Sequence, residues 1–212
     1  MKFVYRFFLG CCLFILSGCE TFKSSSQTTT RLESSYYRIE APGQATSDQM
    51  SSFLVNNNKE LSPQFTSFLA SVYIEECADE GINADIAFCQ MCHETNFLKF
   101  GNQVHIRQNN FAGLGATDDG ARGIRFPSVR AGVRAHVQHL KAYASYAPLQ
   151  KATIDPRFSK VVRGSAPTLF DLSGKWATDS QYAYKIEEKL YNLYNPPNTF
   201  SSFIAQINPF GK

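Results

Sequence analysis

The sequence lacks an apolar run long enough to cross a membrane as a helix, and it carries little net charge. The apolar run near the N-terminus extends only from Phe7 to Leu16, whereas a membrane-spanning helix needs about 20 residues. The net charge is +3, and it falls to +1 when Lys2 and Arg6 are removed with a leader segment. No basic patch then points to nucleic acid as a partner. With 212 residues and no internal repeats, the chain has the length of one ordinary domain.

Metal-binding motifs are also lacking. His93 and Glu94 begin an HExxH pattern, but its second histidine would stand at position 97, which is Phe97. His136 and His139 lie three residues apart and could share a ligand, yet no third ligand is evident. We therefore expect no metal and no cofactor, and we expect these imidazoles to be satisfied within the core or by solvent.

Cysteine is scarce beyond position 19. Cys77, Cys89 and Cys92 remain, and the CxxC spacing of the last two is not surrounded by the βαβ pattern of a redox fold. We expect buried free thiols that pack as small hydrophobic groups. A disulfide between Cys77 and Cys89 is the alternative in an oxidising compartment.

The N-terminus has the features of an export signal. Lys2 and Arg6 precede the short apolar run, which ends in residues 16–19 (LSGC), a sequence that resembles the lipobox of bacterial lipoproteins. That resemblance implies a signal peptide over 1–18 and lipid on Cys19, and hence a cell-envelope protein anchored to a membrane. Glu20 is not the Asp that marks inner-membrane retention in some bacteria, which favours the outer membrane or cell surface. A plain signal peptide with a chance cysteine is the alternative.

The mature chain divides into a polar segment and a folded domain. Residues 19–45 are rich in Ser, Thr and Gln, and such a composition is typical of a flexible tether. We expect the folded domain to span 46–212.

Four segments of the domain are expected to be helical. Ser62 and Pro63 form a start signal, apolar residues follow at helical spacing, and Gly81 is a stop signal. The next helix begins at Asn83 and is apolar on most sides, which predicts a central position. The others are expected from Ser128 and, with Asp179 as its cap, from about Asp179 to Tyr194.

Between these helices, residues 100–127 are rich in Gly, Asn and Asp, and Ile124 and Phe126 alternate with Arg125 as in a short strand. The sequence therefore predicts a mainly α fold with a small β-hairpin lobe inserted after the second helix.

Glu94 is the strongest candidate for chemistry. It ends the most apolar helix, next to the glycine-rich segment. A carboxyl group among apolar side chains has a raised pKa, as a general acid requires. The alternative is a helix-terminal Glu paired with Lys99 or an arginine.

Three motifs resemble the glucosaminidase family, glycoside hydrolase family 73. They are residues 87–97 (AFCQMCHETNF), 109–114 (NNFAGL) and 176–186 (WATDSQYAYKI), in the family's order. The sequence departs from the family at Cys92 and His93, where small or aliphatic residues are common, and before Phe111, where Asn replaces Leu. The resemblance implies an α+β lysozyme-like fold.

The resemblance also implies roles for single residues. Glu94 corresponds to the catalytic acid and Tyr182 to the tyrosine that lines the reaction centre, although its pattern alone equally fits a core residue. Asn110 and Phe111 correspond to the floor of the cleft that holds the sugar. We also expect Gly113 and Trp176, which lie within the matched motifs, to bind substrate.

Asp118 and Asp119 are the candidates for a second catalytic carboxylate. Glycosidases with two carboxylates place them about 5–5.5 Å apart for retention and about 6.5–9.5 Å apart for inversion. Asp118-Asp119-Gly120 is also a good turn sequence. If neither aspartate reaches the site, the N-acetyl oxygen of the substrate could serve as the nucleophile.

The implied activity is an endo-β-N-acetylglucosaminidase that cuts peptidoglycan glycan strands, acting as a monomer. A lytic transglycosylase and a non-catalytic peptidoglycan-binding lipoprotein are the alternatives.

Overall fold

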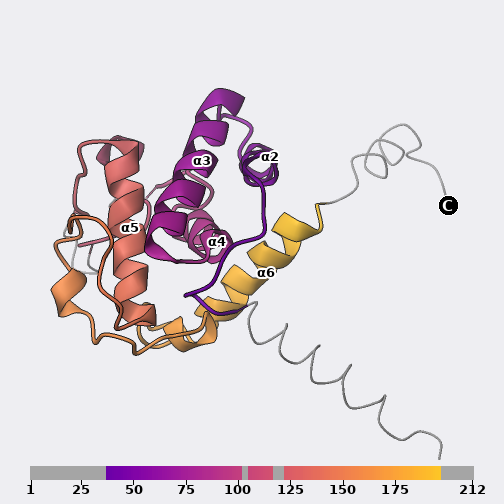
Figure 1. The fold of residues 1–212 in the computed structure, drawn as a ribbon. Coiled ribbons are helices and arrows are strands. Elements are labelled where there is room, and N and C mark those ends of the chain that lie inside the picture. The colour runs from indigo at the N-terminus through magenta and orange to yellow at the C-terminus, as the bar shows by residue number, and fades with distance from the viewer. Residues whose placement is uncertain (1–36, 102–104, 117–121, 197–212) are drawn as a thin grey trace, which may run out of the picture. The chain divides into compact units, whose positions relative to one another are not determined.

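A computed structural model describes residues 37–101, 105–116 and 122–196, and this part of the chain is mainly helical. Four of its five α-helices are arranged around the remaining one (Figure 1). The five are α2 (Ser47–Asn57), α3 (Pro63–Glu80), α4 (Ala84–Glu94), α5 (Val129–Ala144) and α6 (Tyr182–Tyr194), with short 3-10 turns at Ile106–Gln108, Phe158–Lys160 and Phe170–Leu172.

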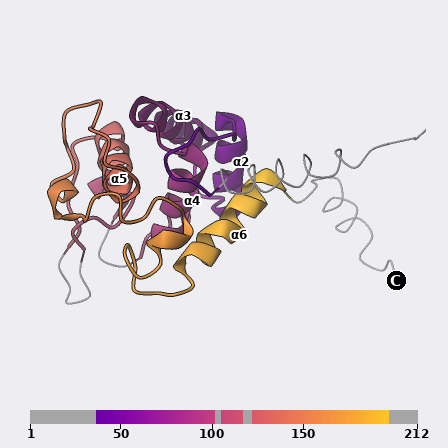
Figure 2. The ribbon, with the colours of Figure 1, turned by 60° about the horizontal axis from the view of Figure 1, so that its bottom comes forward.

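Helix α4 occupies the centre, as its apolar sequence predicted. Every residue from Ala84 to Cys92 is buried, and the helix contacts α3, α5 and α6. Figure 2 shows the same arrangement from a second direction, with α5 and α6 on opposite sides of α4. The Asn83 side chain caps the helix by accepting the backbone N–H groups of Asp85 and Ile86. Only the last two residues, His93 and Glu94, are partly exposed.

The start and stop signals of α3 are confirmed. Ser62 Oγ accepts the backbone N–H of Phe65, and Pro63 is the first helical residue. Gly81 ends the helix in the left-handed conformation, with φ of 71°, which glycine adopts without steric cost. Ser128 likewise caps α5 through the N–H of Ala131.

Helix α6 begins later than predicted. It starts at Tyr182, whereas we expected Asp179 to cap it. Asp179 Oδ1 instead accepts the backbone N–H of Gln181 and closes a turn just before the helix. At the other end, α6 stops at Tyr194, two residues before Pro196.

The folded domain also begins earlier than the expected boundary at residue 46. Ile39 is fully buried, and backbone hydrogen bonds join it to Pro167 and Asn83. Asp85 accepts the N–H groups of Gln44 and Ala45 and so fixes the next residues against α4. Residues 37–45 are therefore part of the domain, because apolar and polar contacts both attach them to its core. The expected signal peptide over 1–18, the lipidated Cys19 and residues 19–36 lie outside the described residues.

The predicted β-hairpin lobe is not confirmed, because the described residues contain no β-strand. Residues 122–127 contact the preceding segment through two backbone hydrogen bonds, from Ile124 to Leu114 and from Phe126 to Gln108. The Asn110 side chain forms hydrogen bonds with further backbone groups here, namely the N–H and C=O of Leu114 and the C=O of Ile124. A side chain thus satisfies backbone groups that a regular ladder would otherwise pair.

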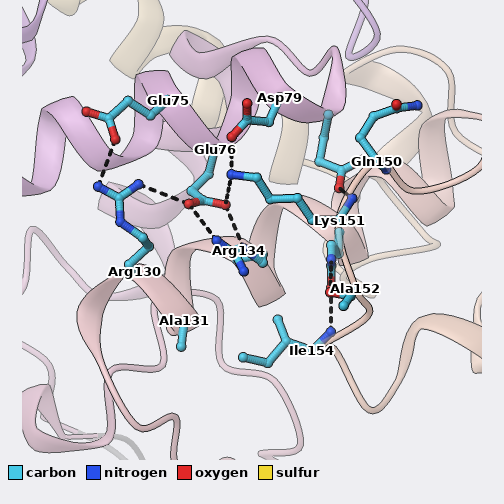
Figure 3. A network of polar contacts seen from close by, with 12 residues as sticks. Glu75, Glu76, Asp79, Arg130, Ala131, Arg134, Gln150, Lys151, Ala152 and Ile154 are labelled. Atoms are coloured by element: carbon cyan, nitrogen blue, oxygen red, sulfur yellow. Dashed lines mark hydrogen bonds and ion pairs between the residues drawn. The ribbon is translucent and has the colours of Figure 1, made fainter.

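A network of charged groups joins α3 to α5 (Figure 3). Glu76 has no exposed surface, and its carboxylate contacts Arg130 at 3.0 Å, Arg134 at 2.8 Å and Lys151 at 3.5 Å. Burial raises the pKa of Glu76, but the hydrogen bonds and charges of these cations outweigh it, so the net pKa is lowered. Glu76 is therefore a buried, ionised structural residue.

The three described cysteines are free and buried, as we expected. Burial raises the pKa of each thiol above its ordinary value, which keeps the thiols protonated and unreactive. Across the described ranges, none of the helices is both long and apolar enough to span a bilayer.

Candidate active site

Glu94 reaches a cleft where α4 and α6 meet the segments around Gly113 and Trp176. The cleft has a volume of about 610 Å³ and is lined by residues far apart in the sequence, including Glu94, Gly113, Tyr143, Trp176 and Tyr182. The structure therefore brings together four of the residues that the sequence singled out: Glu94, Gly113, Trp176 and Tyr182.

The two oxygens of the Glu94 carboxyl group have different surroundings. Oε1 accepts the indole N–H of Trp176 at 2.8 Å and also the hydroxyl of Tyr182. Oε2 has no hydrogen-bond partner among residues 37–101, 105–116 and 122–196. It lies beside Gly113, where an added Cβ would come within 3.9 Å of it. Because Oε1 accepts two hydrogen bonds, the proton of the neutral acid belongs on Oε2.

The environment favours the protonated acid. Burial raises the pKa of Glu94, and the hydrogen bonds from Tyr182 and Trp176 lower it only in part, so the net pKa lies above the ordinary value. None of the ion pairs in the described parts of the chain includes Glu94, so the alternative of a pair with Lys99 or an arginine is not found. Burial, followed by the charge of Glu94, raises the pKa of Tyr182 well above its usual range, which keeps the phenol protonated.

A family model for the glucosaminidase domain, described as mannosyl-glycoprotein endo-β-N-acetylglucosaminidase, matches residues 70–195. The chain belongs to the glucosaminidase family. It is therefore a glycoside hydrolase, and the matched region contains every residue of the cleft described above.

Two individual proteins resemble this glucosaminidase. An uncharacterized protein of Borreliella burgdorferi is 42% identical over 158 residues, which cover 74% of this chain and 78% of the relative. Among solved structures, the catalytic domain of the autolysin Auto from Listeria monocytogenes aligns with 84% of this chain and 99% of its own, at 14% identity and a TM-score of 0.41.

Asn110 and Phe111 do not line the cleft of the glucosaminidase, contrary to our expectation. Asn110 is 0% exposed and Phe111 is 1% exposed, so neither can contact a sugar. The Asn110 side chain accepts the backbone N–H of Ala112 and bonds both backbone groups of Leu114, on either side of Gly113, and Phe111 packs in the main core. These residues hold in place the turn that carries Gly113, and Gly113 itself lines the cleft.

The candidate second carboxylates, Asp118 and Asp119, lie outside the described residues. The cleft does contain another carboxyl group, Asp179, which the sequence had indicated only as a helix cap. Its Oδ2 contacts Lys185 Nζ at 2.6 Å. The hydrogen bond from Lys185, followed by that from the Gln181 N–H, lowers the pKa of Asp179 and keeps it ionised.

Aromatic rings form one wall of the cleft. The ring centroids of Trp176 lie 5.6 Å from Tyr143 and 5.1 Å from His139. His139 Nδ1 bonds Asp155 Oδ2 at 2.8 Å, so the histidine is held against the indole that contacts Glu94. The three rings of this wall therefore pack against one another.

The two histidines that might have shared a metal ligand have separate partners. His136 bonds Tyr73 and Gln90, whereas His139 bonds Asp155. Across the described ranges, no group of three or more His, Cys, Asp or Glu residues is arranged to hold a metal. Of the two, His139 lines the cleft, whereas His136 is fully buried.

The chain leaves α4 through an unusual left-handed turn at the edge of the cleft. Asn96, Phe97 and Leu98 have φ values of 48°, 55° and 61°, a conformation that costs energy for residues other than glycine. Thr95 Oγ1 accepts the N–H of Leu98, and Asn58 donates to the carbonyl of Phe97, which hold the turn in place. Backbone strain of this kind is concentrated at functional sites.

Proposed function

We propose that this glucosaminidase hydrolyses the glycan strands of peptidoglycan, cutting the β-1,4 bond after N-acetylglucosamine with Glu94 as the general acid. The observation that carries the proposal is the asymmetry of the Glu94 carboxyl group. Oε1 is held by Trp176 and Tyr182, while Oε2 lies at the cleft next to Gly113 without a partner among the described residues. A proton on Oε2 is thereby presented to a bound substrate.

The first step transfers this proton. Oε2 gives it to the glycosidic oxygen as the bond from that oxygen to the anomeric carbon breaks, which releases one sugar as an alcohol and leaves an oxocarbenium-like centre. The hydrogen bonds from Tyr182 and Trp176 favour the ionised form of Glu94. They therefore stabilise the carboxylate that forms once the proton has left.

The second step adds water. Its oxygen bonds to the anomeric carbon, and one of its protons passes to the carboxylate that assists the attack. That carboxylate releases the proton to solvent and Glu94 takes one up from solvent, which restores the starting state. For the group that assists on the other face of the sugar we retain Asp118 and Asp119, which follow the cleft-lining Ala116 by two and three positions. The N-acetyl group of the substrate is the alternative, and that route needs only Glu94 and an orienting tyrosine.

The location is proposed from the N-terminal sequence. A short apolar run followed by residues 16–19 (LSGC) favours a lipoprotein attached through Cys19 to a membrane of the cell envelope. Labelling of intact cells with a palmitate analogue, compared with a Cys19→Ala variant, tests the anchor separately from the enzymatic activity.

Product analysis tests the enzymatic proposal. Purified peptidoglycan is digested, and the fragments are analysed by mass spectrometry before and after borohydride reduction. We expect fragments with a reducing N-acetylglucosamine end. Fragments with an anhydro-muramic end would instead show a lytic transglycosylase. Binding to peptidoglycan without release of new ends would show a non-catalytic binding protein, and either result would contradict the proposal.

A further inference from the structure

A chain of buried hydrogen bonds leads through the core to Glu94. It starts at Tyr73 in α3, whose hydroxyl lies 3.0 Å from His136 Nδ1 in α5. His136 Nε2 lies 2.9 Å from Gln90 Oε1 in α4, and Gln90 Nε2 donates to the Tyr182 hydroxyl at 2.9 Å. Tyr182 donates in turn to Glu94 Oε1. Side chains from four helices therefore meet in one continuous chain.

The first three members of this chain are sealed from solvent. Tyr73, Gln90 and His136 all have an exposed fraction of 0%. A buried polar group without a partner is costly, so each must be satisfied by its neighbours in the chain. Every buried side-chain nitrogen and oxygen in the described residues does have a partner.

The direction of the chain is set at Tyr73. Burial raises the pKa of its phenol well above the ordinary value, so the hydroxyl keeps its proton. Its one hydrogen-bond partner among the described residues is His136 Nδ1, so a buried hydroxyl proton that needs an acceptor must be donated to that nitrogen. Burial also lowers the pKa of His136 to about 3, so the ring is neutral and carries its one proton on Nε2.

The donor and acceptor of each remaining hydrogen bond then follow from this tautomer. The Nε2–H of His136 needs an acceptor, which fixes the Gln90 amide with Oε1 toward the histidine and Nε2 toward Tyr182. Because the Tyr182 oxygen accepts from Gln90, its own proton is available to Glu94. With the amide reversed, Gln90 Oε1 would draw that proton away and Glu94 Oε1 would lose a donor.

We propose that Tyr73, His136 and Gln90 are positioning residues that fix Tyr182 as a donor to Glu94 Oε1 and so keep the acid proton on Oε2. This inference rests on the proposed function only in that Glu94 is the acid. The series of hydrogen bonds from Tyr73 ends at Glu94 whether or not the protein cuts glycan.

Two substitutions of His136 test the inference. His136→Leu removes the donor to Gln90, whereas His136→Gln supplies an amide N–H for Gln90 and an oxygen to accept from Tyr73. We expect kcat to fall about tenfold in His136→Leu, the loss typical of one hydrogen bond. In His136→Gln we expect kcat within about threefold of wild type, and KM unchanged in both.

The pH profile distinguishes positioning from simple support of the fold. The Tyr182 hydrogen bond lowers the pKa of Glu94, so its loss should move the basic limb of the kcat profile to higher pH in His136→Leu but not in His136→Gln. The other titratable groups that line the cleft, His93, Tyr143, Asp179, His139 and Arg157, are the same in all variants. Thr66→Val is the control, since Thr66 is equally buried but bonds Ser51 and Pro63 instead.

A ¹³C NMR titration of the Glu94 carboxyl carbon gives a readout that does not require activity, with the signal assigned by its loss in Glu94→Gln. The inference predicts a higher Glu94 pKa in His136→Leu than in wild type, His136→Gln and Thr66→Val. An unchanged pKa in folded His136→Leu would overturn it. If His136→Leu does not fold, Tyr73→Phe takes its place, with a smaller shift in the same direction expected and no shift overturning the inference. A raised wild-type pKa in a protein that cuts no glycan would refute the proposed function alone.

Discussion

Two glutamates, the fully buried Glu76 and the partly exposed Glu94, have pKa values shifted in opposite directions within one small domain. Glu76 contacts two arginines and a lysine in the network that joins α3 and α5 (Figure 3), and its net pKa is lowered. Glu94 contacts only the neutral donors Trp176 and Tyr182, and its net pKa is raised. Burial alone pushes both pKa values upward, so the difference comes from the charge of the partners.

The comparison shows how the same side chain serves two purposes. Cations beside Glu76 keep its carboxylate ionised, which ties two helices together but leaves no proton to give away. Neutral donors beside Glu94 orient the carboxyl group and stabilise its charge only in part, so the proton stays until a substrate accepts it. A glutamate with a raised pKa at a cleft is a candidate acid, whereas one with a lowered pKa in an ion-pair network is a structural residue.

The largest expected effect separates the two glutamates by activity. Glu94→Gln should lower kcat by at least about a thousandfold, because an amide cannot release a proton, and should leave the fold intact. Glu76→Gln, the matched control, should retain activity within about threefold at a temperature where it is folded. Release of reducing ends from peptidoglycan measures both. Equal losses of kcat in the two variants would contradict the different roles assigned to the two glutamates.

Stability should respond in the opposite way. Glu76→Gln leaves Arg130, Arg134 and Lys151 without their shared anion, and we expect a loss of about 2–3 kcal/mol in the free energy of unfolding. That is less than the ~3–5 kcal/mol typical of a broken buried pair, because the side chains of these cations are 40%, 26% and 31% exposed. Urea denaturation followed by circular dichroism measures the change. A loss below about 0.5 kcal/mol would show that the network contributes little.

The donors to Glu94 should have an intermediate effect. Tyr182→Phe should lower kcat by roughly ten- to a hundredfold, since it removes a hydrogen bond to a charge that develops during proton transfer. Because that hydrogen bond lowers the Glu94 pKa, the basic limb of the kcat profile should also move to higher pH. Trp176→Phe should shift it in the same direction. A move of the limb to lower pH in either variant would contradict the assigned role of these donors.

The smallest effect concerns the pH dependence of stability. A lowered folded-state pKa at Glu76 contributes stability that is present above the unfolded pKa and is lost as the pH falls through the folded value. A raised folded-state pKa at Glu94 contributes stability below the unfolded pKa that is lost as the pH rises through the folded value. In the wild type, the free energy of unfolding should therefore fall by about 1 kcal/mol as the pH rises through the Glu94 pKa, and Glu94→Gln should lack this fall. Thermal unfolding across pH measures the difference. Glu76→Gln should likewise lack the fall in the free energy of unfolding that the wild type shows at acid pH. If Glu94→Gln instead lacked the acid fall and Glu76→Gln the alkaline one, the pKa directions would be contradicted.

Much of the fold could be predicted from local signals. The caps at Ser62, Asn83 and Ser128 and the left-handed Gly81 are encoded within a few residues, and the structure has them as expected. Helix α2 was missed, although Thr46 and Gln49 form a capping box that could have revealed it. The β-hairpin lobe was predicted from the glycine-rich segment 100–127 and from the alternation of Ile124 and Phe126 with Arg125. In the described residues, two backbone hydrogen bonds and the Asn110 side chain take the place of a ladder there.

The site was predicted in part, for a physical reason. Glu94 and Tyr182 stood out by motif, but the roles of Tyr73, Gln90 and His136 depend on contacts between residues 46 to 92 positions apart. No local pattern encodes such contacts. Gly132 is a similar case: a Cβ there would lie 1.7 Å from the carbonyl oxygen of Asn109, so α5 can approach the turn before Gly113 only at a glycine.

The central claim is that Glu94 is a protonated acid held by neutral donors, and a direct titration tests it. Protein labelled with ¹³C at glutamate carboxyl carbons is titrated by NMR, with Glu94 and Glu76 assigned from their Gln variants. The account predicts a pKa for Glu94 above the ordinary value of about 4.3 and a pKa for Glu76 below it. A Glu94 pKa at or below that of Glu76 would contradict the account.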